Sequence, residues 1–104
     1  MSINVDETLE ERSSRYGDFA EGAKTAQAIK AAMSLGNNWN SLQPYMKEAL
    51  ERMTMKIERI LTGDPAYQDN WHDIAGYAIL VEKELQKRDP RLEVEREKDD
   101  EVPF

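Results

Sequence analysis

The chain has 104 residues, enough for one domain with a modest core, and it is acidic, with 21 Asp and Glu against 14 Lys and Arg and a net charge of -7. This charge argues against an extended nucleic-acid interface, which needs a basic face, although two or three focused cations can still hold a phosphate ligand. The absence of cysteine excludes a disulfide framework and a thiolate-bound metal, and the single His72 cannot form a multi-histidine site. Any metal is therefore expected to be a hard cation on carboxylates.

The first residues contain neither the basic region nor the apolar run of a signal peptide. No apolar segment is long enough to cross a bilayer. We therefore expect a cytoplasmic protein that does not enter a membrane.

The first predicted helix is short. Thr8 followed by Glu11 resembles a capping box, so the helix is expected to begin there and to run to about Tyr16. Gly17 suits the left-handed position that follows a helix, and Asp18 can cap the next one. The segment therefore predicts a helix stop followed directly by a helix start.

The second helix is expected over 19–35 because its apolar residues recur at helical spacing. Trp39 lies in the connecting loop, where it is expected to close one end of the core. Ser41 can cap a third helix, with Pro44 in its first turn and Gly63 at its end. This helix carries the clearest amphipathic stripe of the chain, which consists of Met46, Leu50, Met53, Ile57, Ile60 and Leu61.

The fourth helix is expected to begin either at Pro65, with Asp64 as its cap, or after a short loop at Asn70, and to end near Arg88. Residues 74–81 are apolar on every side of such a helix. A helix that is apolar all round is buried all round, and three other helices of so small a chain can barely cover it. We therefore expect a homodimer or a larger homo-oligomer.

Together these elements predict an all-α domain over 1–89, in which four helices are arranged around an antiparallel hairpin of the third and fourth helices. Residues 90–104 are rich in charge and poor in apolar side chains, which predicts an acidic disordered tail.

The register of the hairpin brings charged residues together. Counting outward from the turn near Asp64 places Lys56 opposite Asp73, and Arg59 level with Asn70 and near Asp69. Since an unpaired buried charge is costly, Lys56 and Asp73 are expected to pair. The pair can be purely structural, or it can belong to a site where cations hold a phosphate and Asp69 and Asp73 hold Mg²⁺.

The metal interpretation depends on where the fourth helix begins. If it begins at Pro65, Asp69 and Asp73 share one face and can bind one cation. If it begins at Asn70, Asp69 is a cap residue instead. His72 can act as a general base, although as a lone histidine without a nearby nucleophile it is more typical of a polar rim.

Other residues are weaker candidates. Tyr77 lies one turn after Asp73 and can hydrogen-bond to it or simply pack in the core. Gly76 costs helix stability, which suggests the close approach of another helix. Arg15 and Tyr16 read as a helix end with an exposed arginine, and they join the site only if the first loop folds over the hairpin.

Three segments carry a resemblance to a family of small phage and prophage proteins. They are 10–19, which contains Arg-Tyr-Gly-Asp-Phe, 56–65, which contains Lys-Ile-x-Arg-Ile-Leu and Gly-Asp-Pro, and 69–77, which reads Asp-x-Trp-His-Asp-Ile-Ala-Gly-Tyr. The chain is more distantly similar to the nucleotide-modification-associated helical domain and, through it, to the MazG-like all-α nucleotide pyrophosphatases. Those enzymes oligomerise and hold Mg²⁺ on a Glu-x-x-Glu and a Glu-x-x-Asp pair.

The resemblance implies a MazG-like bundle with a connection to nucleotides, in the host cytoplasm if the protein is phage-encoded. Asp69 matches the aspartate of the second acidic pair, whose glutamate position holds Ala66. Lys56 and Arg59 stand near the place of the first pair, while Glu48 and Glu51 lie too early in the helix. The function this predicts is binding of a nucleotide or another phosphate-bearing small molecule. The bound nucleotide could also be hydrolysed in a Mg²⁺-dependent pyrophosphohydrolase reaction. The alternative is a non-enzymatic protein, which either sequesters a nucleotide signal or acts as an adaptor that binds a host protein. The ligand contacts expected are Lys56, Arg59, His72, Tyr77, Arg15 and Tyr16.

Overall fold

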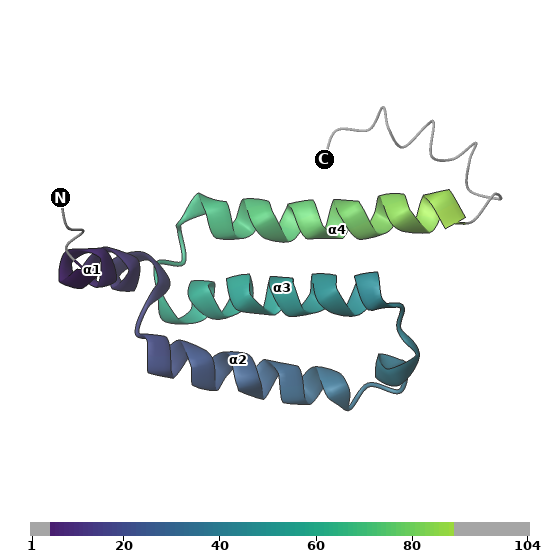
Figure 1. The fold of residues 1–104 in the computed structure, drawn as a ribbon, viewed down its shortest axis with the longest axis horizontal. Helices are drawn as coiled ribbons and strands as arrows, with labels where there is room; N and C mark the ends of the chain where they lie inside the picture. Colours follow the sequence, from purple (N-terminus) through teal and green to yellow (C-terminus); the bar gives the residue numbers. More distant parts are fainter. Residues whose placement is uncertain (1–4, 89–104) are drawn as a thin grey trace.

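The computed structural model describes residues 5–88, and in this range it is helical with no strand (Figure 1). The helices are α1 (Val5–Tyr16), α2 (Phe19–Ser34), the short 3₁₀ helix η1 (Trp39–Ser41), α3 (Pro44–Thr62) and α4 (Gln68–Arg88). The predicted all-α class is thus confirmed. The predicted disordered tail and the domain boundary before it lie outside the described residues.

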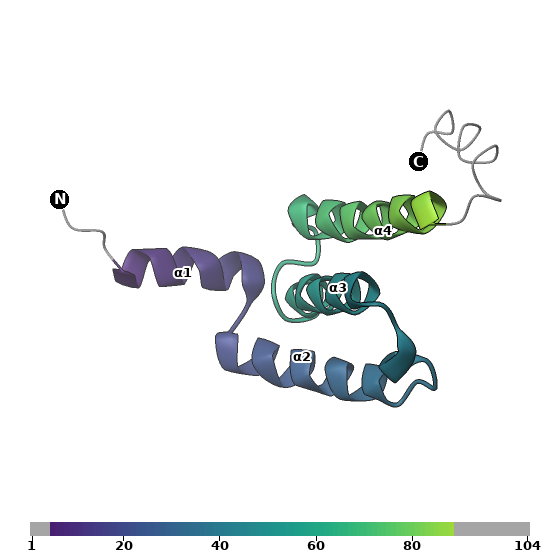
Figure 2. The same ribbon diagram turned by 45° about the vertical axis from the view of Figure 1, so that its right-hand side comes forward.

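The helices α2, α3 and α4 lie side by side in one layer with α3 in the middle (Figures 1 and 2). α3 packs along α4 on one side and along α2 on the other. The first helix, α1, lies at the end of the layer where α2 begins, and it buries none of its own residues. The hairpin of α3 and α4 is therefore flanked by α2 on a single side.

Most helix ends follow the sequence. Gly17 has a φ of 85°, the left-handed conformation expected after α1. The carboxylate of Asp18 accepts a hydrogen bond from the Glu21 amide at 3.1 Å and so caps α2. Pro44 lies in the first turn of α3, and Gly63 is its C-terminal cap.

Two predicted caps are wrong. α1 begins at Val5, so Thr8 lies inside the helix, where acidic Asp6 and Glu7 in the first turn favour the earlier start. Ser41 does not cap α3, because its hydroxyl donates to the Asn38 carbonyl at 2.9 Å within the turn of η1. Gln43 occupies the N-cap position without a side-chain hydrogen bond.

The start of α4 falls at Gln68, between the two predicted positions. The Asp64 carboxylate accepts from the Ala66 amide at 2.9 Å, and the Asp64 carbonyl accepts from the Tyr67 amide at 3.2 Å. These bonds close a turn over 64–67, which delays the helix. The indole of Trp71 donates to the Pro65 carbonyl at 2.8 Å and secures the turn to α4.

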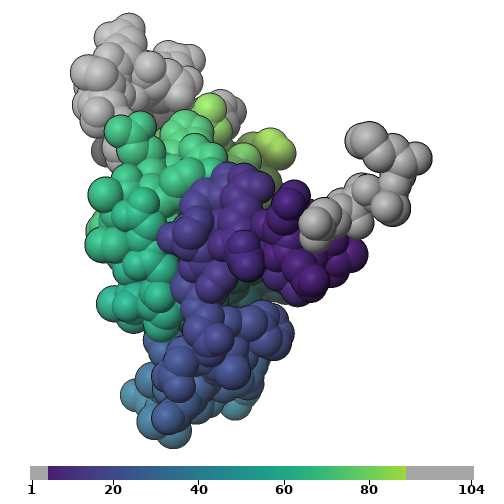
Figure 3. Space-filling view, turned by 90° about the vertical axis from the view of Figure 1, so that its left-hand side faces the viewer, coloured from purple at the N-terminus to yellow at the C-terminus, as the bar shows by residue number. Residues whose placement is uncertain are grey.

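The α1–α2 turn packs directly on the α3–α4 turn. The Asp64 amide donates to the Arg15 carbonyl at 2.9 Å. A Cβ on Gly17 would lie 2.1 Å from the Thr62 carbonyl oxygen, and one on Gly63 would lie 2.4 Å from the Arg15 carbonyl oxygen, so the two backbones touch where only glycine fits. We call this contact the turn–turn joint. Figure 3 looks onto this end of the molecule and shows α1 against the segments around it.

The interior of the chain is small. Ala49 is the only apolar side chain that is buried among residues 5–88, whereas Thr54 and Asn70 are buried polar residues. The Thr54 hydroxyl donates to the Leu50 carbonyl at 2.8 Å. Trp39, expected to close the core, is partly exposed and lies under the Lys47 ammonium, 5.4 Å from the ring centroid. None of the helices in 5–88 has the length and apolar character needed to span a bilayer.

The joint gives a test of its glycines. Gly17→Ala should reduce the free energy of unfolding by more than about 2 kcal/mol, because the left-handed backbone and the Thr62 carbonyl both oppose a Cβ. Gly76→Ala is the matched control, since a Cβ there meets nothing within 4 Å, and it should stabilise α4 by roughly 0.5–1 kcal/mol. Urea unfolding measures both. Similar effects of the two substitutions would contradict the packing of the joint.

Candidate functional site

The predicted ion pair between Lys56 and Asp73 is present in the hairpin of α3 and α4. The Lys56 ammonium lies 2.9 Å from the Asp73 carboxylate, with the side chains 15% and 39% exposed. The hydrogen bond from Lys56 lowers the pKa of Asp73 below its usual value, against an opposing effect of burial, and the nearby charges of His72 and Arg59 lower it further. The register predicted from the turn is therefore confirmed at this position.

Arg59 contacts an aromatic ring at the joint. It was expected level with Asn70 and near Asp69, but its guanidinium carbon lies 4.1 Å from the centroid of the Tyr16 ring, at the end of α1. The reason is that the α1–α2 turn folds onto the hairpin and offers the face of this ring to the cation. Arg59 therefore links α3 to α1 while its charge still acts on Asp73.

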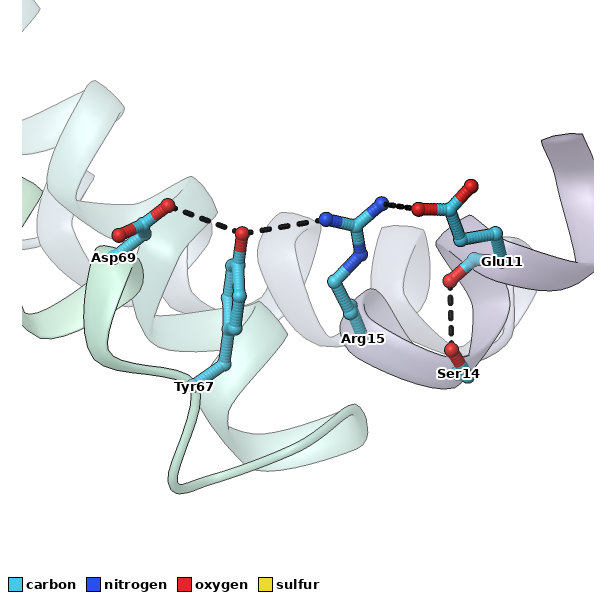
Figure 4. A network of polar contacts seen from close by, with 5 residues as sticks. All are labelled: Glu11, Ser14, Arg15, Tyr67 and Asp69. Atoms are coloured by element: carbon cyan, nitrogen blue, oxygen red, sulfur yellow. Dashed lines mark hydrogen bonds and ion pairs between the residues drawn. The ribbon is translucent and has the colours of Figure 1, made fainter.

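Arg15 also crosses from α1 to the hairpin (Figure 4). Its Nη1 donates to the Tyr67 hydroxyl at 3.4 Å, and that hydroxyl donates to the Asp69 carboxylate at 3.0 Å. On its other side, Arg15 forms an ion pair with Glu11 within α1. The hydrogen bond with Tyr67 raises the pKa of Arg15, burial opposes this, and the charge of Glu11 adds to it. The condition under which Arg15 and Tyr16 join the site is thus met.

Several guanidinium groups surround one ring. Besides Arg59, the guanidinium carbons of Arg12 and Arg15 lie 5.9 and 5.8 Å from the Tyr16 centroid. Tyr67 meets Tyr16 edge to face, with centroids 6.2 Å apart. We call these five residues the arginine–tyrosine cluster. In a chain with a net charge of -7, three guanidinium groups at one point form the kind of focused cationic site that an anion needs.

One donor of the cluster has no partner. The Nε of Arg15 is buried without a hydrogen-bond partner in the described chain, and the same holds for Nδ2 of Asn70 in the first turns of α4. Buried polar groups are normally hydrogen-bonded, so these two donors are exceptions within the described chain.

A cavity of about 490 Å³ opens beside the cluster, between α1, the start of α2 and α3. Arg12, Tyr16 and Arg59 line one part of it, and the acidic side chains of Asp18 and Glu58 also reach it. Its apolar wall consists of Leu9, Phe19 and Met55. Its size and its mixture of apolar surface with a few polar groups are typical of sites for small molecules.

The remaining candidates lie away from this cavity. His72 is exposed on α4. Tyr77, for which the sequence left open a hydrogen bond to Asp73 or packing in the core, has its ring centroid 5.9 Å from the Arg52 guanidinium carbon. Tyr77 and Arg52 line a separate cavity of about 300 Å³ together with Glu48, whose carboxylate bonds to Arg52 at 2.8 Å.

The carboxylates expected to bind Mg²⁺ share one helix, since α4 begins before Asp69. Each already has a partner, because Asp69 accepts from Tyr67 and Asp73 pairs with Lys56. Within residues 5–88, no group of three or more His, Cys, Asp or Glu is arranged to hold a metal ion. Mg²⁺ usually takes one or two carboxylates plus phosphate oxygens, so these residues fit it only together with a phosphate ligand.

Sequence reasoning missed two members of the cluster. Arg12 stands four residues before Tyr16 on one helix, a spacing that could have indicated their contact. Tyr67 lies in the turn before α4, outside any periodic pattern, and only the fold of the joint brings it to Arg15.

The ion pair predicts a pH dependence. Because the pKa of Asp73 is lowered on folding, its contribution to stability is present at neutral pH and is lost as the pH falls through that lowered value, below about pH 4. Asp73→Asn should therefore lower the melting temperature at pH 7, and the difference from the wild type should vanish in acid. Glu82→Gln, at an exposed position of α4, is the control and should behave like the wild type at every pH. A constant difference for Asp73→Asn would contradict the pairing.

Comparison of the chain with protein-family models, with curated proteins and with solved structures gives no match. The arginine–tyrosine cluster and its cavity combine focused positive charge, aromatic rings and apolar surface at one place.

Proposed function

We propose that the chain binds a nucleotide at the arginine–tyrosine cluster, on a MazG-like helical scaffold. The observation that carries the proposal is the meeting of Arg12 and Arg59 over Tyr16 at the edge of a partly apolar cavity. The three groups come from two helices that contact each other only because the joint closes.

The phosphates are the part of a nucleotide that the cations would hold. A guanidinium offers paired donors that match phosphate oxygens, and Arg12 and Arg59 are the two that line the cavity. Arg15 stands beside them at the Tyr16 ring and would add its charge. Lys56 stands one turn before Arg59 on α3, but it pairs with Asp73 and does not line the cavity, so it would act on the phosphates only through its charge.

The base is the part that the apolar wall would accommodate. Leu9, Phe19 and Met55 give a surface of the kind on which a flat ring can lie, and Phe19 is 89% exposed and therefore available to a ligand. Tyr16 joins the two parts, since its ring borders both the cations and the cavity. His72 and Tyr77 lie outside the cavity and are not required by this arrangement.

Binding without hydrolysis is the version that the donor set favours. Cleavage of a phosphoanhydride by a metal-activated water needs a metal held in place on the protein. Asp69 and Asp73 are the carboxylates available to Mg²⁺ bound to the phosphates, and both are engaged by other side chains. Sequestration of a nucleotide is therefore proposed ahead of pyrophosphohydrolysis.

Nucleotide binding can be tested by thermal shift and calorimetry with nucleoside mono-, di- and triphosphates and with inorganic phosphate, each with and without Mg²⁺. We expect stabilisation by a nucleotide that does not require Mg²⁺ and leaves the nucleotide intact. Stabilisation only with Mg²⁺, accompanied by release of pyrophosphate, would instead support the enzyme. No shift with any nucleotide would overturn the proposal and favour an adaptor for a protein partner.

Substitution of Arg59 locates the site. Arg59→Gln should weaken the binding of that nucleotide roughly 10- to 100-fold, the loss expected for one charge-assisted hydrogen bond of about 1.5–3 kcal/mol. Arg52→Gln is the matched control on α3, because Arg52 is exposed, pairs with Glu48 and lies outside the cavity. Calorimetry measures both variants after urea unfolding has established that they are folded. Equal affinities would place the phosphates elsewhere.

A further inference from the structure

Two sides of α3 are occupied by its neighbours. Toward α4, Lys56 pairs with Asp73, and the ring of Tyr45 lies 4.7 Å from the Arg88 guanidinium carbon. Toward α2, the Thr54 hydroxyl lies 3.6 Å from the Met33 sulfur. Because successive residues of a helix are about 100° apart, two further sides of α3 remain between these contacts.

One of the two remaining sides carries the predicted apolar stripe. Along α4, a matching series occurs at the same helical spacing. Met46, Leu50 and Met53 of α3 and Ala78 and Val81 of α4 line one cavity of about 340 Å³, so the two series lie on the same side of the hairpin. We call this surface the hairpin face. It consists of Met46, Leu50, Met53, Ile57 and Ile60 of α3 and Ile74, Ala78, Val81 and Leu85 of α4.

The hairpin face is uncharged and open. None of its residues is ionisable, and Ile57 and Leu85 are 37% and 40% exposed. The other remaining side of α3 carries Met55 and Arg59, which line the cavity beside α1, so α1 packs away from the hairpin face. Among residues 5–88, the long helices packed on α3 are α4, α2 and α1, and the contacts above place them on its other sides.

The chain needs a cover for this surface. A folded domain depends on burial of apolar area, and within 5–88 only Ala49 is a buried apolar side chain. Residues 89–104 are a poor cover by composition, since ten of these sixteen residues are charged. A stable helical chain of this kind therefore requires apolar surface from another molecule.

We propose that a second copy of the chain covers the hairpin face, so that two α3–α4 hairpins pack together as a four-helix bundle. An uncharged face can meet its own copy without repulsion, although each chain carries a net charge of -7. α3 has 19 residues and is about 28 Å long, and two helices are about 20 Å wide. Because side chains make the accessible surface larger than this flat outline, the area that the hairpin face could bury approaches the roughly 800 Å² per partner of a standard interface.

The need to bury the hairpin face also favours a second copy of the chain as the partner that binds there. The exposed core belongs to the chain's own fold, so the partner must be present whenever the chain folds, and another copy always is. In the dimer the arginine–tyrosine cluster stays accessible, because it lies on the opposite side of α3.

The molar mass of the unliganded chain tests the proposal, and it is independent of nucleotide binding. Light scattering after size exclusion should give twice the chain mass of 12.0 kDa at micromolar concentration. Ile57→Glu should give a chain of half that mass or an unfolded one, which circular dichroism distinguishes. Leu80→Glu is the control: Leu80 is more exposed, at 64%, but it lines the cavity with Arg52 on the other side of the hairpin, so the dimer should persist.

A folded wild-type monomer of 12.0 kDa would overturn the proposal, as would a dimer that Leu80→Glu dissociates and Ile57→Glu does not. A second measurement does not depend on the folding of the Ile57 variant. Because the chain has no cysteine, Glu82→Cys at an exposed position accepts one spin label. Pulsed electron paramagnetic resonance should then record a defined distance between the two spin labels of a dimer. The absence of such a distance would also overturn the proposal.

Discussion

The backbone contact between Gly17 and Gly63 determines how the rest of the molecule is arranged. At this point two turns touch so closely that neither can carry a Cβ, and the Asp64 amide bonds to the Arg15 carbonyl. Because α1 buries none of its residues, its position depends strongly on this contact. With it, Arg15 reaches Tyr67 and Tyr16 lies under Arg59, so the cationic cluster is a product of the joint.

The two sides of α3 that face neither α2 nor α4 carry different proposed functions. One side, with Arg59 and Met55, borders the cavity beside α1 and carries the proposed ligand site. The other side carries the hairpin face, which lacks charge and is proposed to bind a second copy. Lys56 and Asp73 lie between α3 and α4, where their bond fixes the register of the hairpin. A single helix thus separates a polar function from an apolar one.

Features that depend on local sequence were predictable. The Lys56–Asp73 pair follows from counting residues outward from one turn, and the end of α1 and the start of α2 follow from Gly17 and Asp18. The start of α4 at Gln68 was not predicted, because the side chain of Asp64 caps a turn as readily as a helix.

The cluster itself depends on contacts between distant segments. Arg15 and Tyr67 are 52 residues apart in sequence, and nothing in the pattern around either one indicates the other. The amphipathic stripe of α3 identified an apolar side correctly, but periodicity does not say what covers it. Within the described residues no helix covers the hairpin face. The apolar stripe of α3, which the sequence predicts to be part of a core, therefore borders solvent.

The anchoring of α1 at one end has a mechanical consequence. This helix has 12 residues and is about 18 Å long, and its last turn is tied to the hairpin through Arg15 and Tyr16. This attachment lies at the C-terminal end of α1, beside the guanidinium groups. Because the far end of the helix lies farther from this attachment than the guanidinium groups do, a small change in their spacing would move that end by a larger amount.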